Sequence, residues 1–227
     1  MSDPVRPLVA VVDFGMGNLF SVQKACEHVG LAAKVTSSGE EILSADAVIL
    51  PGVGAFGDAM SALRRLKLVS VLEAVAESSK LLLGICLGMQ LLMRESYEFG
   101  HHTGLGIIPG HVVRFEHPKG EPGALKVPQV GWNRLFRAQS AGSETWDDTL
   151  LDGLPDGVYM YFVHSFYAEP SDDSVVLATT RYGDIEFCSA LRHNHVSAFQ
   201  FHPERSGRDG LKIYANLGAQ LRNNDDL

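Results

Sequence analysis

The chain has 227 residues, of which 45% are hydrophobic and 20% are charged, and its formal net charge is −8 at pH 7. A chain of this length and composition can bury a substantial core, and we expect residues 1–227 to form a single globular domain. The negative charge argues against nucleic acid and anionic membranes as partners, because both repel an acidic surface.

The sequence shows no membrane-spanning or secretory pattern. Its longest apolar run, residues 81–93, is too short to span a bilayer and is broken by two glycines and a glutamine. Residues 1–7 are polar and contain proline, unlike a secretory signal. The three cysteines are widely spaced and odd in number, so they predict no disulfide framework. We therefore expect a cytoplasmic protein.

The first half of the chain alternates predicted strands and helices. We expect strands at residues 8–14, 32–36 and 47–50, helices at residues 19–29, 56–66 and 69–78, and then a strand that leads to Cys86. This alternation predicts an α/β fold, with a mostly parallel open sheet and helices on both faces. The ligand site of such a sheet lies beyond the carboxyl ends of its strands, where residues 13–17, residues 51–54 and Cys86 fall.

The second half of the chain changes to short strands separated by turns. We expect strands at residues 112–115, 132–136, 159–166, 175–179, 187–191 and 196–201, and a closing helix at residues 207–221. These strands predict an antiparallel layer. Because no repeat or linker separates the halves, a single domain remains the economical interpretation.

The most informative local pattern is Gly-Ile-Cys-Leu-Gly at residues 84–88, which precedes a helical segment expected to continue to Met93. It has the form of a nucleophile elbow, in which a strained residue stands at a strand-to-helix turn with small residues two positions either side. Cys86 is the residue so presented, and N–H groups at the helix start would favour its thiolate. The N–H of Leu87 would point toward an oxyanion formed by attack. Taken alone, a cysteine such as Cys86 is more often a buried core residue, and a histidine such as His202 a structural one.

A thiolate nucleophile needs a base, and His202 is the candidate. Glu204 stands two residues later on an extended chain, so its carboxylate can orient the imidazole and leave the other ring nitrogen for the Cys86 proton. His164 is a rival base, but no carboxylate stands two residues after it, so we expect a structural role for it. The elbow glycines and the His-Pro-Glu triplet together favour a Cys86–His202–Glu204 triad.

Other patterns do not support a metal or a cofactor. Gly-Met-Gly-Asn at residues 15–18 lacks the spacing of a dinucleotide-binding loop. The histidines at residues 101–102 and 193–195 have no Cys, Asp or Glu at ligand spacing, so we expect no metal site. Cys26 and Cys188 lie in apolar segments and are predicted to be core residues.

Beyond the triad, motifs over nearly the whole chain resemble the glutamine amidotransferases, and among them the glutaminase subunits of imidazole glycerol phosphate synthase. These motifs are Asp-Phe-Gly-Met-Gly-Asn-Leu (13–19), Pro-Gly-Val-Gly-Ala-Phe (51–56), Val-Pro-Gln-Val-Gly-Trp-Asn (127–133), Tyr-Phe-Val-His-Ser (161–165) and Gln-Phe-His-Pro-Glu-Arg-Ser-Gly (200–207). The related glutaminase of pyridoxal phosphate synthesis carries Gly-Gly-Glu-Ser in place of Pro-Gly-Val-Gly. The chain departs from the family at Arg205, where lysine is usual, at Gln129, where histidine is common, and in a longer segment at 133–160.

The resemblance also implies roles for residues around the triad. The N–H of Val53 would join that of Leu87 in an oxyanion hole, and the loop at residues 15–18 would face a partner protein. Glutamine would be recognised, mostly through backbone groups, by Gly52, Gln90, Ser165 and Phe166. The departures at Arg205, at Gln129 and in the longer segment 133–160 leave the triad intact, and each is a place where contacts with the partner can differ from those of the family.

By the same resemblance the chain would hydrolyse glutamine to glutamate and ammonia without a cofactor. It would pass the ammonia to a (β/α)8-barrel cyclase that makes imidazole glycerol phosphate and AICAR in histidine biosynthesis. One alternative is a paralogous glutaminase subunit that supplies a related synthase in surface-sugar biosynthesis, which residues 97–100 and 186–189 resemble. Two others are a free-standing γ-glutamyl or peptide hydrolase and a silent binding module, although the intact triad argues against the last.

Overall fold

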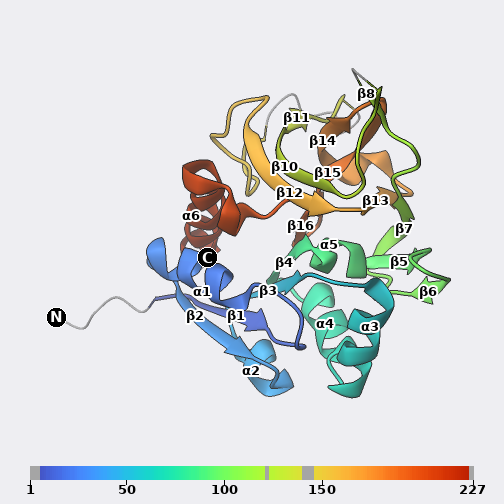
Figure 1. Ribbon diagram of the computed structural model, residues 1–227. Coiled ribbons are helices and arrows are strands. Elements are labelled where there is room, and N and C mark those ends of the chain that lie inside the picture. The colour runs from blue at the N-terminus through green and yellow to red at the C-terminus, as the bar shows by residue number, and fades with distance from the viewer. Residues whose placement is uncertain (1–5, 121–122, 140–145, 225–227) are drawn as a thin grey trace.

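The computed structural model describes residues 6–120, 123–139 and 146–224, so residues 1–5 and part of the long segment 133–160 lie outside the description. Its main sheet has eight strands in the order β11-β14-β15-β16-β4-β3-β1-β2 (Figure 1). The first half contributes β1 (Leu8–Val12), β2 (Ala32–Thr36), β3 (Ala47–Gly52) and β4 (Leu81–Cys86). The second half contributes β11 (Phe136–Arg137), β14 (Val176–Tyr182), β15 (Ile185–His193) and β16 (Val196–Phe199).

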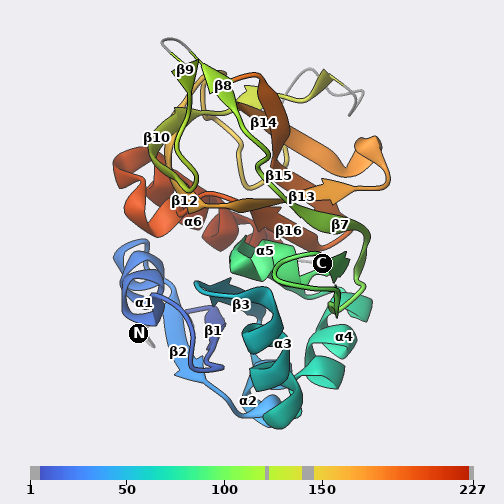
Figure 2. The same cartoon turned by 45° about the vertical axis from the view of Figure 1, so that its right-hand side comes forward.

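Five neighbouring strands, β16-β4-β3-β1-β2, run parallel. Along β1, Ala10 and Val12 face one apolar core while Val9 and Val11 face the other, so both faces of the sheet need cover. One face is covered by α2 (Gly39–Ser44), α3 (Phe56–Arg65) and α4 (Val69–Glu77), the other by α1 (Leu19–His28) and α6 (Gly207–Asn224). Figure 2 separates α1 and α6 from α3 and α4. The predicted parallel sheet with helices on both faces is confirmed.

The predicted antiparallel strands of the second half are divided between the main sheet and three smaller sheets, in which only the pairing of β5 with β7 is parallel among the described residues. β14, β15 and β16 pair antiparallel and continue the main sheet beyond β4, which makes that sheet mixed at one end. A further sheet has the order β13-β7-β5-β6, β10 pairs with β12, and β8 pairs with β9. The bounds are β5 (Met93–Ser96), β6 (His102–Thr103), β7 (Ile108–Arg114), β8 (Lys119–Gly120), β9 (Gly123–Ala124), β10 (Gln129–Arg134), β12 (Tyr159–His164) and β13 (Phe166–Pro170), with short 3-10 turns η2 (Asp173–Val175) and η3 (Pro203–Arg205).

Several elements differ from the sequence-based predictions. The helix expected to continue to Met93 ends earlier, because α5 spans only Leu87–Leu91 and Met93 opens β5. The strand expected over residues 159–166 is interrupted at Ser165, where the chain passes from β12 to a different sheet. The apolar run at residues 81–93 is thus divided among three elements. Among the described residues no helix is long and apolar enough to cross a membrane.

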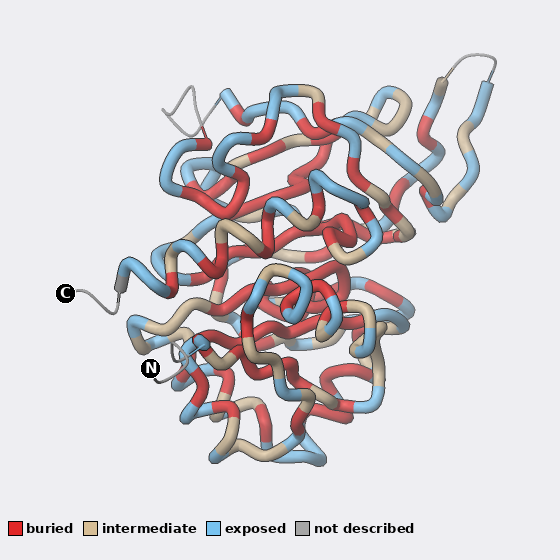
Figure 3. Tube along the Cα trace, turned by 90° about the vertical axis from the view of Figure 1, so that its left-hand side faces the viewer, coloured by how far each residue is buried: buried red, intermediate tan, exposed pale blue. Residues whose placement is uncertain are grey.

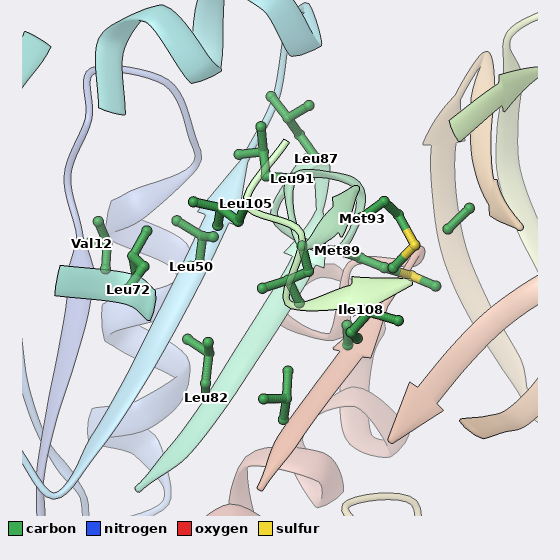
Figure 4. Close-up of a cluster of buried hydrophobic side chains, with 14 of the residues drawn as sticks. Val12, Leu50, Leu72, Leu82, Leu87, Met89, Leu91, Met93, Leu105 and Ile108 are labelled. Carbon is green, nitrogen blue, oxygen red and sulfur yellow. The ribbon is translucent and has the colours of Figure 1, made fainter. Parts of the chain in front are cut away.

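The apolar cores on the two faces of the sheet surround the point where β4 meets α5. Figure 3 shows buried positions concentrated along the central strands, with exposed positions in the outer loops. In Figure 4, Leu87, Met89 and Leu91 of α5 lie with Leu50 and Leu82 in the first core. All five residues of α5 are buried, so the turn before it is held by packing on several sides.

Candidate active site

Cys86 stands at the sharp turn between β4 and α5. Its backbone has φ 54° and ψ −108°, a conformation that a non-glycine residue adopts only under strain. A methyl group at Gly88 would lie 2.8 Å from the carbonyl carbon of Leu50 and closer still to its oxygen. A methyl group at Gly84 would lie 3.0 Å from the nitrogen of Met89. The two glycines therefore let α5 pack directly on β3 and β4, and this packing holds Cys86 in its strained conformation.

The side chain of Cys86 meets polar groups from two other elements. Gln200 Nε2 donates a hydrogen bond to Cys86 Sγ over 3.7 Å, and the carbonyl oxygen of Val163 lies 3.9 Å from the same sulfur. Because α5 has only five residues, the Gln200 amide is a more important donor to this sulfur than a long helix dipole would be, whereas the Val163 carbonyl can only accept from the thiol. The sequence assigned no role to Gln200, since a separation of 114 residues from Cys86 gives no sign that the two side chains meet.

His202 and Glu204 form a buried pair next to this turn. His202 Nδ1 lies 2.9 Å from Glu204 Oε1, and the two side chains are only 3% and 1% exposed. The pair is made across the start of η3, whereas the prediction placed both residues on an extended strand. The N–H of His202 donates to the carbonyl of Tyr161, and Ser206 Oγ donates to the carbonyl of His202, at 2.9 and 2.7 Å. These bonds fix the backbone that carries the imidazole.

The surroundings of His202 favour its charged form. Burial lowers the pKa of the imidazole. Electrostatic interaction and hydrogen bonding with the Cys86 and Glu204 side chains have the larger effect and raise the pKa to about 10. The second ring nitrogen, Nε2, is buried and has no hydrogen-bond partner of ordinary length within the described ranges. Since Nδ1 is bonded to Glu204, Nε2 is the ring nitrogen that is free to interact with a group on the Cys86 side.

The rival histidine, His164, lies in a different environment. It is buried beside the rings of Phe115, Phe162 and Phe187, and its Nδ1 lies 2.8 Å from the carbonyl oxygen of Phe166. Burial lowers the pKa of His164 to about 4, so the imidazole is neutral near pH 7. Among the described residues no carboxylate bonds to its ring, so His164 lacks the orienting partner that His202 has, although it lines the cavity described next.

A cavity of about 450 Å³ opens beside Cys86. It is lined by Val53, Gly54, Cys86, Leu87, Gln90, Glu98, Pro128, Val163, His164, Ser165, Phe166 and Arg205. Every residue that the resemblance connects with the oxyanion or with glutamine is among them except Gly52. Gly52 pairs with Cys86 between β3 and β4, and a methyl group there would meet Leu87 at 3.0 Å, so it lies just outside the lining.

Gln90 links the cavity wall to the strand behind it. Its Nε2 donates to the carbonyl oxygen of Phe166 at 2.8 Å and to Gln200 Oε1 at 3.0 Å. The carbonyl of Phe166 thus accepts from Gln90 in addition to its contact with His164 Nδ1. These bonds use both hydrogens of the Gln90 amide, which leaves its oxygen as the group that can meet a ligand.

Glu98 is a residue of the cavity that sequence reasoning missed. It is 9% exposed, and its Oε2 accepts a hydrogen bond from the N–H of Phe56, the first residue of α3, at 2.6 Å. Burial raises the pKa of Glu98, while the hydrogen bond from Phe56 opposes that rise. The acidic side chain of Glu98 is visible in the sequence, but nothing in the sequence shows that residue 98 lines the same cavity as Cys86.

The loop after β3 brings Val53 to the mouth of the cavity. Val53 is 42% exposed, and Gly54 beside it has φ 117°, a conformation that favours glycine. A side chain at Gly54 would collide with Met16, and one at Gly17 would approach Gly52, so the loops after β1 and β3 lie against each other. The sequence placed both loops at the carboxyl ends of strands, as observed, and the structure shows that these strands, β1 and β3, are neighbours.

The two other cysteines are chemically different from Cys86. Cys26 and Cys188 are buried, which confirms the prediction that both are core residues. Burial raises the pKa of Cys26 to about 12 and raises that of Cys188 as well, so both stay as unreactive thiols near pH 7. In the part of the chain that the structure describes, no group of three His, Cys, Asp or Glu residues could hold a metal ion.

Comparison with known proteins agrees with this geometry. Residues 10–219 match the family model of class-I glutamine amidotransferases, so the chain belongs to that class. It is 48% identical over 212 residues to the imidazole glycerol phosphate synthase subunit HisH of Syntrophotalea carbinolica, with 93% of this chain and 99% of that protein covered. The HisH subunit of Aquifex aeolicus is 48% identical over 209 residues, with coverage of 91% and 94%. Within its class, the chain belongs to the family of HisH subunits of imidazole glycerol phosphate synthase.

More distant solved structures share the fold. The structure of PurLQS from Thermotoga maritima matches with a TM-score of 0.72 at 20% sequence identity, covering 96% of this chain and 100% of that one. A crystal structure described as a glutamine amidotransferase matches with a TM-score of 0.67 at 20% identity, covering 93% and 98%. The predicted glutamine amidotransferase-like architecture is thereby confirmed.

Proposed function

We propose that this chain is a glutaminase that hydrolyses glutamine to glutamate and ammonia as one subunit of imidazole glycerol phosphate synthase, in histidine biosynthesis. The observation that carries the proposal is the His202–Glu204 contact of 2.9 Å beside the strained Cys86, at the edge of a cavity. A nucleophile, a base and an orienting carboxylate are the groups that covalent amide hydrolysis requires. The names of the HisH relatives support this pathway over surface-sugar synthesis or a free-standing hydrolase.

The reaction starts with attack of the Cys86 thiolate on the γ-amide carbon of glutamine. His202 then donates its Nε2 proton to the departing nitrogen, ammonia leaves, and a γ-glutamyl thioester remains on Cys86. Neutral His202 next takes a proton from water, which attacks the thioester and releases glutamate. Glu204 holds the imidazole and stabilises its charged form throughout, in agreement with the raised pKa of His202.

We assign the oxyanion hole to the backbone N–H groups of Leu87 and Val53. Leu87 is the first residue of α5, where backbone N–H groups have no partner within the helix. Val53 stands in an exposed loop between two glycines, so the orientation of its peptide can change at low cost. One oxyanion donor is worth about 10²–10³ in rate. A partner that orients the Val53 peptide would therefore switch the glutaminase on.

We assign recognition of glutamine to Gly52, Gln90, Ser165 and Phe166, and we add Glu98. The carbonyl of Phe166 already accepts a bond from Gln90, so we assign its role to the ring or the N–H. Glu98 is the carboxylate in the cavity lining, and it would pair with the α-ammonium group of glutamine.

The partner we propose is a (β/α)8-barrel cyclase that consumes the ammonia. The names of the relatives as subunits support a second protein, and an exposed aromatic surface beside the cavity supports where it docks. On this surface Trp132 is 56% exposed and packs edge-on against Tyr161, whose ring lies 4.4 Å below the guanidinium of Arg205. Arg205 also lines the cavity.

We further propose that residues 1–227 act as one domain, since one sheet joins both halves, and that the enzyme works in the cytoplasm.

The test is steady-state glutamate production by the chain alone and with the co-purified synthase and its acceptor ligand. We expect slow hydrolysis alone and an increase of about 10²-fold or more in the complex, the contribution of one oxyanion donor. Cys86→Ala should lower turnover by about 10³-fold or more, and a glutamine-like electrophile should label Cys86 while sparing Cys26 and Cys188. Near wild-type turnover in Cys86→Ala would refute the proposed nucleophile. Full activity of the isolated chain would contradict control by the partner.

A further inference from the structure

The hydroxyl of Tyr214 is buried in the protein interior, and the mechanism above does not use it. Tyr214 lies in α6 with a side chain that is 0% exposed. No residue in the described ranges makes a hydrogen bond to its hydroxyl. A buried hydroxyl that bonds to nothing is costly, so this group calls for a partner nearby.

The second oxygen of the triad carboxylate has the complementary need. Glu204 bonds to His202 through Oε1, whereas its Oε2 is buried and receives no hydrogen bond from the described residues. An ionised carboxylate oxygen can only accept a hydrogen bond, and a neutral phenol can donate one. Each group therefore lacks a hydrogen-bond partner of the kind that the other provides.

The packing of α6 brings these groups into the same region. The helix lies directly against η3, the turn that carries Glu204. A methyl group at Gly210 would lie 2.8 Å from the carbonyl carbon of Pro203 and closer still to its oxygen, so this glycine permits the close approach. Tyr214 follows Gly210 by four residues, one turn further on the same face of the helix.

Electrostatic interaction between the two side chains agrees with this placement. Burial raises the pKa of Tyr214 well above its ordinary value, and the negative charge of Glu204 raises it further, followed by that of Cys26 in α1. Tyr214 therefore keeps its proton near pH 7 and can act as a donor.

We propose that Tyr214 is a positioning residue of the glutaminase, whose hydroxyl donates to Oε2 of Glu204 across one buried water and so holds that carboxylate against His202. The inference rests on the proposed function. Tyr214 is absent from the lining of the cavity, so it acts through Glu204 and does not touch glutamine.

The first test is Tyr214→Phe, which removes the hydroxyl and keeps the ring. In the complex with the synthase we expect kcat for glutamine to fall about 10-fold, the factor that a hydrogen bond to a charged group supplies, with KM changed by less than about 2-fold. Tyr182→Phe is the matched control, because the Tyr182 hydroxyl donates to the carbonyl of Lys126 at 2.6 Å, away from the triad, and its loss should leave kcat unchanged. An unchanged kcat in Tyr214→Phe would overturn the proposal.

A double-mutant cycle with Glu204→Ala separates positioning from packing. If Tyr214 acts through the carboxylate, Tyr214→Phe has no further effect on kcat once Glu204 is replaced. Equal effects in both backgrounds would overturn the proposal and leave Tyr214 a purely structural role. The wild-type complex distinguishes failure of the proposed function from failure of this inference. If the complex lacks glutaminase activity, the proposed function fails as well. If it is active and Tyr214→Phe is unimpaired, only this inference fails.

Discussion

Replacing Gly88 by alanine tests whether the geometry of the elbow, beyond the presence of its cysteine, supports catalysis. The added methyl would lie 2.8 Å from the carbonyl carbon of Leu50 and closer still to its oxygen. Ordinary contact between carbon atoms is about 3.5–4.0 Å, and the oxygen is closer than the carbon, so α5 must move from β3 by about 1 Å or more. The obstacle is backbone at the centre of a parallel sheet, which cannot rotate away as a flexible side chain does.

This movement should affect stability and rate by different amounts. Overpacking of this kind costs about 1–3 kcal/mol of stability. Because Cys86 lies two residues before Gly88, the sulfur moves relative to His202, and a misplacement of about 1 Å can cost about 10²-fold in rate. We therefore expect Gly88→Ala to remain folded at low temperature and to lose about 10²-fold in kcat/KM for glutamine.

Urea unfolding and glutaminase assays in the complex would measure both effects. Gly218→Ala is the matched control, because a methyl group there would meet its nearest atom, the end of the Arg222 side chain, at 3.3 Å. An alanine within α6 should leave the rate unchanged and stabilise the fold by about 0.5–1 kcal/mol. Should Gly88→Ala keep its kcat/KM within about 2-fold of wild type, the argument that the glycines fix Cys86 would be refuted.

Three other predictions follow from the site. His202→Ala should lower glutamine turnover by about 10³-fold and Glu204→Gln by less, whereas an essential His164 with a dispensable His202 would contradict the assignment of the base. Glu98→Gln keeps an acceptor for Phe56 but removes the charge, so KM for glutamine should rise about 10-fold or more, and an unchanged KM would rule out pairing with the α-ammonium group. The pKa of His202 rises from 6.5 to about 10 on folding, so its stabilising contribution is present below pH 6.5 and lost as pH rises through 10. Urea unfolding at several pH values should show a steeper alkaline loss in wild type than in His202→Asn, and identical slopes would contradict the raised pKa.

The glycines and apolar patterns of the sequence predicted the elements that support the site. The parallel strands were predicted because each is a short, largely apolar run bounded by turn residues, and this pattern depends on local burial. Cys86, His202 and Glu204 were also predicted, because the elbow and the His-Pro-Glu triplet are local motifs whose chemistry is specific. The six-residue α2 and the early end of α5 were not predicted, since elements this short are set by packing and carry little periodicity.

What the sequence could not determine is which distant residues meet at Cys86. Gln200 and Glu98 are separated from the elbow along the chain, and their proximity to Cys86 depends on how the segment after β16 and the loop after β5 fold back beside β4. The sequence by itself determined the α/β class, the strained turn and the choice of Cys86 as the proposed nucleophile, because backbone conformation and side-chain chemistry are local properties. Only the tertiary structure decided the cavity, the donor to the sulfur and the surroundings that raise the pKa of His202, because burial and electrostatic interaction depend on distances in space.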